Sequence, residues 1–222
     1  MSFYPFLAPD TLEVQQWCET YHLNRIEQPI EQPFLQWGNP LQLVMDQRPV
    51  NMAQPASRLK GHLLLKAFAN HRHLTVFDAT AGLLGDAQII LALQHTVIAC
   101  EQHPMLAALI QSFCQHHHLE NTLKPLFGDA HHYITQQAVD VVIIDPMFDD
   151  PKQTPKAKKN MQSIQSLVPQ KDLSSLLPIA LKQARLKVLV KQHASASPWL
   201  PNQVNHQLSS KKLSFRWDVY IP

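Results

Sequence analysis

The sequence predicts an α/β fold built on a doubly wound, mostly parallel sheet. Its clearest strand is 139–144, in which five of six residues are apolar and β-branched, as is typical of a strand buried on both faces. From residue 74 onward, predicted strands alternate with predicted helices. Parallel strands need such helical connections, and we expect the connections to be right-handed.

Short apolar runs and longer helical stretches predict the elements of the main domain in order. The strands are expected at 74–77, 96–100, 123–127, 139–144 and 186–190. The helices are expected at 56–68, 84–93, 105–117, 161–168 and 172–184. Near the end of the chain, in 211–221, apolar residues alternate with polar ones, which predicts a last, antiparallel strand at the edge of the sheet.

Residues 1–53 are predicted to form a small N-terminal region of their own. Prolines within 29–49 divide it into short segments. A helix is expected near 11–21, and the apolar runs at 34–35 and 41–45 indicate short strands joined by turns. The pairing of these strands does not follow from the sequence.

The composition limits the classes of partner. With 222 residues and a net charge of +2, the chain has no strong overall field, so affinity for nucleic acid must come from a local basic patch. The three cysteines and 13 histidines show no paired spacing of metal ligands, and we expect buried thiols and no metal site. The chain has neither a basic leader with an apolar run nor about 18 continuous apolar residues, which predicts a cytoplasmic protein that is not bound to a membrane.

The predicted strand 139–144 ends in a corner, Asp145-Pro146-Met147-Phe148. Open α/β sheets bind ligands at the carboxyl ends of their strands, and Pro146 ends the hydrogen-bonded ladder there. The Asp145 carboxylate and the Pro146 carbonyl can accept two N–H groups of a flat amine, while Phe148 can stack on its ring. The sequence alone leaves open a structural alternative, in which Asp-Pro only ends the strand and the aromatic ring packs in the core.

A turn of small residues follows the first predicted strand. It runs from Asp78 to Asp86 and contains Gly82 and Gly85. Because it lacks the G-x-G-x-x-G fingerprint of dinucleotide-binding folds, a ligand without phosphates is favoured over a pyrophosphate. Asp78 and Asp86 are predicted to accept hydrogen bonds from an amine of that ligand.

Acidic residues stand at the ends of four successive predicted strands. Glu101 ends the second strand, where a carboxylate in such folds binds both ribose hydroxyls. Asp129 follows the third strand, from which it can reach the exocyclic amine of an adenine. One acidic strand end is weak support, since Asp and Glu also cap helices. Asp78 and Asp145 complete the set of four. Together these four acidic residues predict a positively charged, adenosine-like cofactor, which S-adenosylmethionine matches better than a dinucleotide does.

Several motifs of the chain occur together in one known family. They are Asp78-Ala79-Thr80-Ala81-Gly82-Leu83 with Asp86, Asp145-Pro146-Met147-Phe148, Lys152-Gln153, Lys158-Lys159, Met161, Gln165-Ser166-Leu167-Val168, 188–191 and Arg216-Trp217-Asp218-Val219-Tyr220. Their combination resembles the class I S-adenosylmethionine-dependent methyltransferases, which have a Rossmann-like fold. More narrowly, it resembles the ribosomal RNA small subunit methyltransferase J family, which methylates the exocyclic N2 of a guanosine in 16S rRNA. This resemblance covers residues 74–222 and implies a methyltransferase domain at 54–222.

The resemblance implies roles for individual residues. The implied cofactor-binding residues are Asp78, Gly82, Gly85, Asp86, Glu101, Gln102, Asp129, Ala130 and Asp145. Asp145 and the Pro146 carbonyl are expected to hold the N2 amine of an unpaired guanine, with Phe148 stacked on the base. The family pattern reads Gly-Leu-Gly-Arg-Asp where this chain has Gly82-Leu83-Leu84-Gly85-Asp86, so one glycine is displaced and an arginine is lost.

Lysines follow the corner within a polar loop broken by prolines, where RNA phosphates are expected to pass. The predicted RNA-binding residues are Lys152, Lys156, Lys158 and Lys159. The next candidates are Arg58, Lys60, Lys66, Lys211, Lys212 and Arg216. The predicted partner is therefore 16S rRNA or the small ribosomal subunit.

Three other functions remain open from the sequence. The same corner serves amino-methyltransferases that act on DNA adenine or on a protein glutamine. The altered Leu84-Gly85 turn is compatible with a catalytically silent module that binds S-adenosylmethionine or RNA. A nicotinamide oxidoreductase is disfavoured, because the dinucleotide fingerprint is missing.

Overall fold

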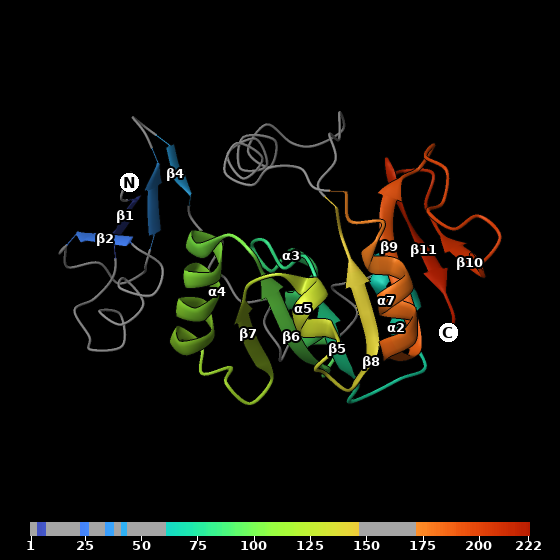
Figure 1. Ribbon diagram of the computed structural model, residues 1–222, viewed down its shortest axis with the longest axis horizontal. Helices are drawn as coiled ribbons and strands as arrows, with labels where there is room; N and C mark the ends of the chain where they lie inside the picture. Colours follow the sequence, from blue (N-terminus) through green and yellow to red (C-terminus); the bar gives the residue numbers. More distant parts are fainter. Residues whose placement is uncertain (1–3, 8–22, 27–33, 38–40, 44–60, 147–171) are drawn as a thin grey trace.

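The computed structural model of this chain describes residues 4–7, 23–26, 34–37, 41–43, 61–146 and 172–222 (Figure 1). These residues form two sheets with five helices. The predicted helices near 11–21 and 161–168 lie outside the described residues, as do the first residues of the helix predicted at 56–68.

A seven-stranded sheet forms the centre of the fold, in the order β10-β11-β9-β8-β5-β6-β7. Five neighbouring strands, β9, β8, β5, β6 and β7, run parallel to one another, and β11 runs antiparallel to β9. The strands are β5 (Thr75–Asp78), β6 (Thr96–Glu101), β7 (Leu123–Phe127), β8 (Val139–Ile144), β9 (Ala184–His193), β10 (His206–Leu208) and β11 (Phe215–Tyr220). This topology confirms the predicted doubly wound, mostly parallel sheet with an antiparallel last strand.

The position of the last strand differs from the prediction. β11 does not form the edge of the sheet, because β10 pairs with its outer side, His206 opposite Val219 and Leu208 opposite Trp217. β10 has only three residues, and its His206 and Gln207 are exposed. Such a short polar strand carries no period-2 pattern that would have predicted it.

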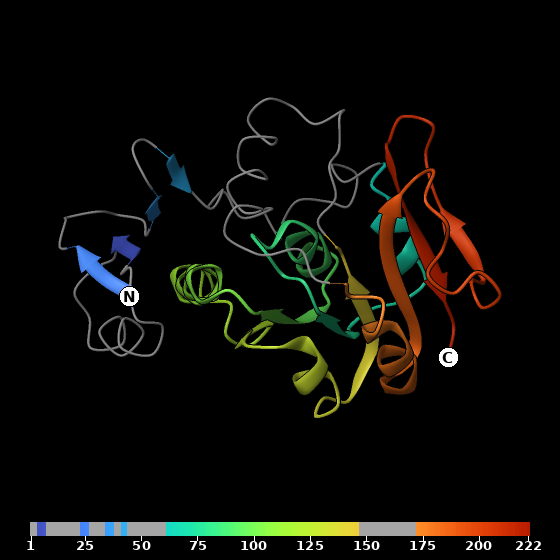
Figure 2. The same ribbon diagram turned by 45° about the horizontal axis from the view of Figure 1, so that its top comes forward.

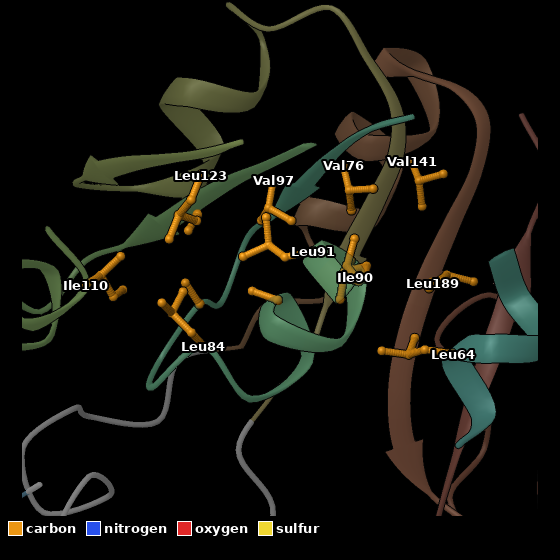
Figure 3. Close-up of a cluster of buried hydrophobic side chains, with 14 of the residues drawn as sticks. Leu64, Val76, Leu84, Ile90, Leu91, Val97, Ile110, Leu123, Val141 and Leu189 are labelled. Carbon is orange, nitrogen blue, oxygen red and sulfur yellow. The ribbon is translucent and has the colours of Figure 1, made fainter. Parts of the chain in front are cut away.

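Helices cover both faces of the sheet (Figure 2). α2 (Leu63–Phe68), α3 (Gly85–Ala92) and α4 (Pro104–His116) lie on one face, and α5 (Ala130–Ile134) and α7 (Leu176–Gln183) on the other. Each face buries its own apolar cluster. In the first cluster Ile90 and Leu91 of α3 pack toward Val76 and Val97 of the sheet, as Figure 3 shows. Because the central strands are buried on both faces by these two clusters, their sequences are nearly continuous apolar runs. This is why the central strands could be recognised in the sequence.

A second, four-stranded sheet lies in the N-terminal region (Figure 1). Its strand order is β2-β1-β3-β4, with β1 (Tyr4–Leu7), β2 (Leu23–Ile26), β3 (Phe34–Trp37) and β4 (Leu41–Leu43). β1 and β2 are parallel and the other pairs are antiparallel. The strands expected at 34–35 and 41–45 are thus present, while the predicted domain boundary at residue 53 lies outside the described residues.

Two further expectations concern buried thiols and membranes. Cys100 and Cys114 are buried with free thiols, as predicted, and burial raises the pKa of Cys100 to about 12. Cys18 lies outside the described residues. Among the helices described here, none has the length and apolar character needed to cross a membrane.

His95 is a buried titratable group far from the acidic strand ends. Its side chain is 2% exposed, its Nδ1 accepts the Leu74 N–H at 3.1 Å, and its ring lies 4.9 Å from that of Phe68. Its Nε2 has no hydrogen-bond partner among the described residues. Burial lowers the pKa of His95 to about 4, and the neighbouring His71, His73 and Lys187 act in the same direction.

The stability of the fold should therefore depend on His95 in mildly acidic solution. Because the folded state lowers this pKa, the unfolded chain takes up the proton first, and His95 should lower the free energy of unfolding by about 2 kcal/mol between about pH 7.5 and pH 5. His95→Asn keeps an acceptor near the Nδ1 position but cannot titrate. In urea unfolding, the difference between wild type and His95→Asn should shrink by this amount at the lower pH. The exposed His118→Asn variant is the control, and an equal change in both variants would contradict the prediction.

Candidate functional site

Three of the four acidic strand ends, Asp78, Glu101 and Asp145, lie on one face of the sheet, the face covered by α2, α3 and α4. Asp129 instead begins α5, which covers the other face. Strand side chains alternate between faces, so a residue two positions beyond a member of the first apolar cluster points the same way. This relation joins Val76 to Asp78, Ala99 to Glu101, Ile143 to Asp145 and Leu189 to Lys191. Asp78, Glu101 and Asp145 are therefore brought to the same side of the sheet as the first turn of α3.

A lysine from β9 lies at the centre of this group. Lys191 Nζ donates to Asp145 Oδ2 at 2.6 Å and to Asp86 Oδ2 at 2.7 Å. The contact with Asp145 follows from the register of the sheet, because Ile144 pairs with Val190 and the two side chains come next along their strands. Asp86 reaches the same ammonium from the first turn of α3. The lysine side chain is only 14% exposed.

Two aromatic rings also lie next to the Lys191 ammonium. Trp217 is the direct cross-strand partner of Lys191 in the β9/β11 pair. Nζ lies 4.9 Å from the centroid of the Trp217 ring and 5.1 Å from that of Phe215. Both distances are within the range of cation–π attraction, so the rings and the carboxylates together hold the ammonium in one place.

The charges in this group shift the pKa of one another. Burial alone would lower the pKa of Lys191, but the Asp145 and Asp86 carboxylates hold it above its ordinary value. Burial raises the pKa of Asp145 to about 7, while Lys191 opposes this shift and Asp86 adds to it. Asp145 and Asp86 were both predicted to accept an amine from a ligand, and in the structure both accept the ammonium of Lys191.

Asp78 adds a third carboxylate to the group. It is 3% exposed, and its Oδ1 accepts the Thr80 N–H at 3.0 Å. Burial raises its pKa to about 7, the Thr80 hydrogen bond opposes this shift, and the nearby Asp86 and Asp145 add to it. Two carboxylates thus contact the Lys191 ammonium, and the third, Asp78, lies close enough to interact with all three groups electrostatically. With three acidic groups and one ammonium, this end of the sheet favours a cationic ligand.

Thr80 connects the loop after β5 to the corner after β8. Its Oγ1 accepts the backbone N–H of Asp145 at 2.7 Å. The Ala79 N–H donates to the Ile143 carbonyl at 2.9 Å, so the same loop is also bonded to the end of β8. The backbone of Asp145 therefore has a fixed position relative to the loop.

The turn from Gly82 to Gly85 uses two left-handed residues. Gly82 has a φ of +51°, where glycine is favoured, but Leu84 has a φ of +60° as well. A side chain in this conformation costs about 1–2 kcal/mol. Leu84 is fully buried in the first apolar cluster, and this burial offsets the cost. Burial in the core thus gives a physical reason why leucine is tolerated where the family pattern has glycine.

Glu101 connects the same turn to α4. Its Oε2 accepts the Gly82 N–H at 2.9 Å, and its Oε1 accepts the His103 N–H at 2.7 Å. Burial raises the pKa of Glu101, and the backbone N–H groups of His103, Gly82 and Gln102 oppose the shift. Glu101 is 7% exposed, and the two backbone N–H groups fix the position of its carboxylate.

Asp129 lies at the start of α5, after β7. Its Oδ1 accepts the His131 N–H at 2.9 Å and also contacts His131 Nδ1 at 2.9 Å. The other ring nitrogen of His131 lies 3.0 Å from Ser175 Oγ at the start of α7. Asp129 is 54% exposed and the adjacent Ala130 is buried, so Asp129 remains open to solvent beside the end of β6.

Other predicted residues lie elsewhere or outside the described chain. Pro146 is half-buried at the end of the described corner, whereas Phe148 and the four predicted RNA-binding lysines lie outside the described residues. Arg216, one of the alternative RNA-binding candidates, is buried in an ion pair. Arg216 is 4% exposed and donates to Asp218 at 2.7 Å and to the carbonyls of three residues, His193, Ala194 and Ala196.

Sequence reasoning missed the roles of Lys191 and Thr80. The available signal for Lys191 was a lysine directly after the apolar run 188–190, at the same strand end that carries the acidic residues on other strands. Thr80 stood within a recognised motif but gave no indication of its partner. Among the residues that the structure describes, no group of three or more His, Cys, Asp or Glu is placed to hold a metal ion.

Comparisons with known proteins agree on one family. A family model described as "Putative SAM-dependent methyltransferase" matches residues 39–222. The Ribosomal RNA small subunit methyltransferase J of Hydrogenovibrio crunogenus is 34% identical over 174 residues, which cover 72% of this chain and 62% of that protein's length. Its counterpart from Neisseria meningitidis is 33% identical over 175 residues, covering 73% of this chain and 69% of that protein.

A solved structure supports the same relationship. The S-adenosylmethionine-dependent methyltransferase of Neisseria gonorrhoeae superimposes with a TM-score of 0.66 and 26% identity. The match covers 97% of this chain and 95% of the other. The similarity therefore extends over nearly the full length of both chains.

Proposed function

The chain belongs to the ribosomal RNA small subunit methyltransferase J family of S-adenosylmethionine-dependent methyltransferases, and we propose that it methylates the exocyclic N2 of a guanosine in 16S rRNA of the small ribosomal subunit. The observation that carries this proposal is the corner at Asp145, a carboxylate anchored at the carboxyl end of β8 within a group of acidic strand ends. The reaction belongs to the larger domain, 54–222, with 1–53 as a separate N-terminal region. A ribosomal substrate places the protein in the cytoplasm.

The charge of the site fits S-adenosylmethionine. The three acidic residues Asp78, Asp86 and Asp145 outnumber the one ammonium among them, that of Lys191, and the cofactor carries a sulfonium and an ammonium group. When bound, the cofactor supplies a methyl group that the sulfonium has already activated. The residues that we propose to bind it are Asp78, Gly82, Gly85, Asp86, Glu101, Gln102, Asp129, Ala130 and Asp145.

Within this set, Glu101 is proposed to accept the ribose hydroxyls. Its carboxylate is fixed by the Gly82 and His103 N–H groups, and two carboxylate oxygens offer about four acceptor positions in total. Asp129 is proposed to accept the exocyclic amine of the adenine, because it is exposed and faces solvent beside the same strand ends.

Asp145 and the Pro146 carbonyl are proposed to accept the two N–H groups of the target amine. Accepting both N–H groups orients the nitrogen lone pair, and the carboxylate offsets the positive charge that develops on nitrogen as it is methylated. Phe148 is proposed to stack on the base. The guanine must be unpaired or flipped out, because its N2 amine is engaged in a duplex.

One experiment tests this function against its alternatives. The protein is incubated with labelled S-adenosylmethionine and small subunits that lack the modification, and the product is digested and mapped by mass spectrometry. We expect one N2-methylguanosine in 16S rRNA. Methylation of DNA adenine or of a protein glutamine, with rRNA unmodified, would identify another amino-methyltransferase. Cofactor binding without turnover on any of these substrates would identify a silent binding module.

RNA binding should depend on the lysines after the corner, Lys152, Lys156, Lys158 and Lys159. Each lysine that neutralises a phosphate releases counterions and steepens the salt dependence by about 0.7 per contact on a single strand. Changing Lys156, Lys158 and Lys159 together to Gln should flatten the slope of log affinity against log salt by about two units. The affinity for S-adenosylmethionine should stay the same.

A matched variant controls for the loss of overall charge. Lys124, Lys182 and Arg185 are exposed and lie near the amino ends of β7 and β9, at the end of the parallel strands opposite to the corner. Changing these three to Gln removes the same charge and should leave the slope near that of wild type. Equal slopes in the two triple variants would place the RNA elsewhere, with the exposed pair Lys211 and Lys212 before β11 as the next positions to change.

A further inference from the structure

We propose that Lys191 is a positioning residue for methyl transfer, which fixes the Asp145 carboxylate through Oδ2 so that Oδ1 is presented to the substrate amine. This inference rests on the proposed function and adds a residue to it. The observation behind it is the 2.6 Å contact between Nζ and Asp145 Oδ2, made by an ammonium that is mostly withdrawn from solvent.

The surroundings of Lys191 explain how a flexible side chain can act as a fixed support. A lysine normally loses much rotamer freedom when it is ordered. Here Trp217 is fully buried and pairs with Lys191 across the strands, and Phe215 lies on the same face. Asp86 anchors the ammonium from α3 at 2.7 Å. The two aromatic rings and the second carboxylate therefore restrict Nζ to a position beside Asp145.

Asp145 is thereby held at two points. Thr80 Oγ1 accepts its backbone N–H at 2.7 Å, and Lys191 donates to its side chain. Backbone and side chain are both fixed before any substrate arrives. A preorganised acceptor of this kind costs no reorganisation during the reaction, which is the condition under which electrostatic groups contribute most to catalysis.

Lys191 also acts on the charge of Asp145. The groups that face this carboxylate or the ammonium are Asp86 from α3, Asp78 from β5, Lys191 from β9 and His62 before α2. Burial, Asp86 and Asp78 all favour a protonated Asp145, and Lys191 is the cation that opposes them. A protonated Asp145 could not offset positive charge on the substrate nitrogen. Removing Lys191 should therefore move the ionisation of Asp145 to higher pH.

The test replaces Lys191 by Met, which keeps an unbranched apolar chain against Trp217 but removes the charge and the donors. We expect kcat to fall about tenfold or more near pH 7.5, with the KM for small subunits changed much less. In a plot of kcat against pH, the acidic limb is the range in which kcat rises as Asp145 ionises. This limb should move up by about one pH unit, so that activity partly recovers near pH 9. Lys191→Arg, which keeps the cation, should keep the wild-type limb.

Lys187→Met is the matched control. Lys187 lies on the same strand and the same face, but its Nζ donates to the Ala67 carbonyl at 2.7 Å and does not contact the acidic group. This variant should have the wild-type pH profile. A uniform loss of activity at every pH in Lys191→Met, or the same profile shift in Lys187→Met, would show that Lys191 is only structural.

A second measurement separates this inference from the proposed function. In protein labelled with 13C at aspartate carboxyls, the Asp145 signal can be assigned by its loss in Asp145→Asn and followed against pH without RNA or cofactor. We expect it to titrate about one pH unit higher in Lys191→Met than in wild type. If wild type does not methylate small subunits, the proposed function fails while this titration still tests the influence of Lys191 on Asp145. If wild type is active and the titration does not move, the role of Lys191 is refuted.

Discussion

Replacing Asp145 by Asn should lower turnover about 100-fold or more, with a much smaller change in the affinity for S-adenosylmethionine. The asparagine keeps the shape of the side chain and the backbone N–H that donates to Thr80 Oγ1. It loses the negative charge, and with it the group proposed to offset positive charge on the substrate amine. A loss of this size is typical when one preorganised electrostatic group is removed from an active site. Single-turnover kinetics on small subunits and calorimetry with the cofactor measure the two quantities separately.

Asp140 on the same strand supplies the control for this prediction. Its Oδ2 accepts the Thr75 N–H at 2.8 Å, and its Oδ1 lies 3.7 Å from Arg185, near the amino end of β8. Asp140→Asn should reduce stability modestly and leave kcat near wild type. Near-wild-type turnover in Asp145→Asn, with circular dichroism unchanged, would remove the corner after β8 from the mechanism.

The central strands could be predicted because burial on both faces leaves a direct mark on the sequence. β8 is apolar at every position but Asp140, and β5, β6 and β9 have similar runs against two apolar clusters. β10 has no such mark, since it is short and largely exposed, and it pairs through backbone groups that any residue provides. The sequence pattern therefore predicts β11 as the edge strand, whereas β10 forms the edge.

The acidic strand ends could be predicted for a different reason. The rule that ligands lie at the carboxyl ends of parallel strands needs only the ends of the strands, and these are visible in the sequence. Predicting the partners of Lys191 requires knowledge of the tertiary structure. These partners depend on the register between β8 and β9, on Trp217 of the neighbouring strand β11, and on the placement of α3. None of these relations is local, so a lysine after an apolar run looked the same as a solvent-exposed one.

The burial of Arg216 has a local signal in the sequence. Arg216 and Asp218 are two positions apart in a strand, so their side chains share a face and can pair. This spacing favours an ion pair within the strand over a contact with RNA. The structure shows the charge of Arg216 held by Asp218 and by carbonyls of the loop after β9, where it supports the backbone of that loop.

Changing Glu101 to Ala should weaken the binding of S-adenosylmethionine by about 1–3 kcal/mol, because a charged hydrogen bond to the ribose is lost. The same change also removes the acceptor of the Gly82 and His103 N–H groups, so a loosened loop is a second possible cause of weaker binding. The two causes differ in their dependence on the ribose hydroxyls. Titration calorimetry with S-adenosylhomocysteine and its 2′-deoxy analogue, on wild type and variant, forms a double-mutant cycle that separates them.

In this cycle the deoxy analogue should bind wild type more weakly than the parent compound, and the variant should bind both compounds equally. Glu120→Ala provides the control, because Glu120 is exposed after α4 and far along the chain from the Gly82 turn. It should reproduce the wild-type preference for the ribose hydroxyl. If Glu101→Ala weakens both compounds by the same factor and keeps their difference, the carboxylate acts only by holding the loop, and the ribose must be bound by another residue.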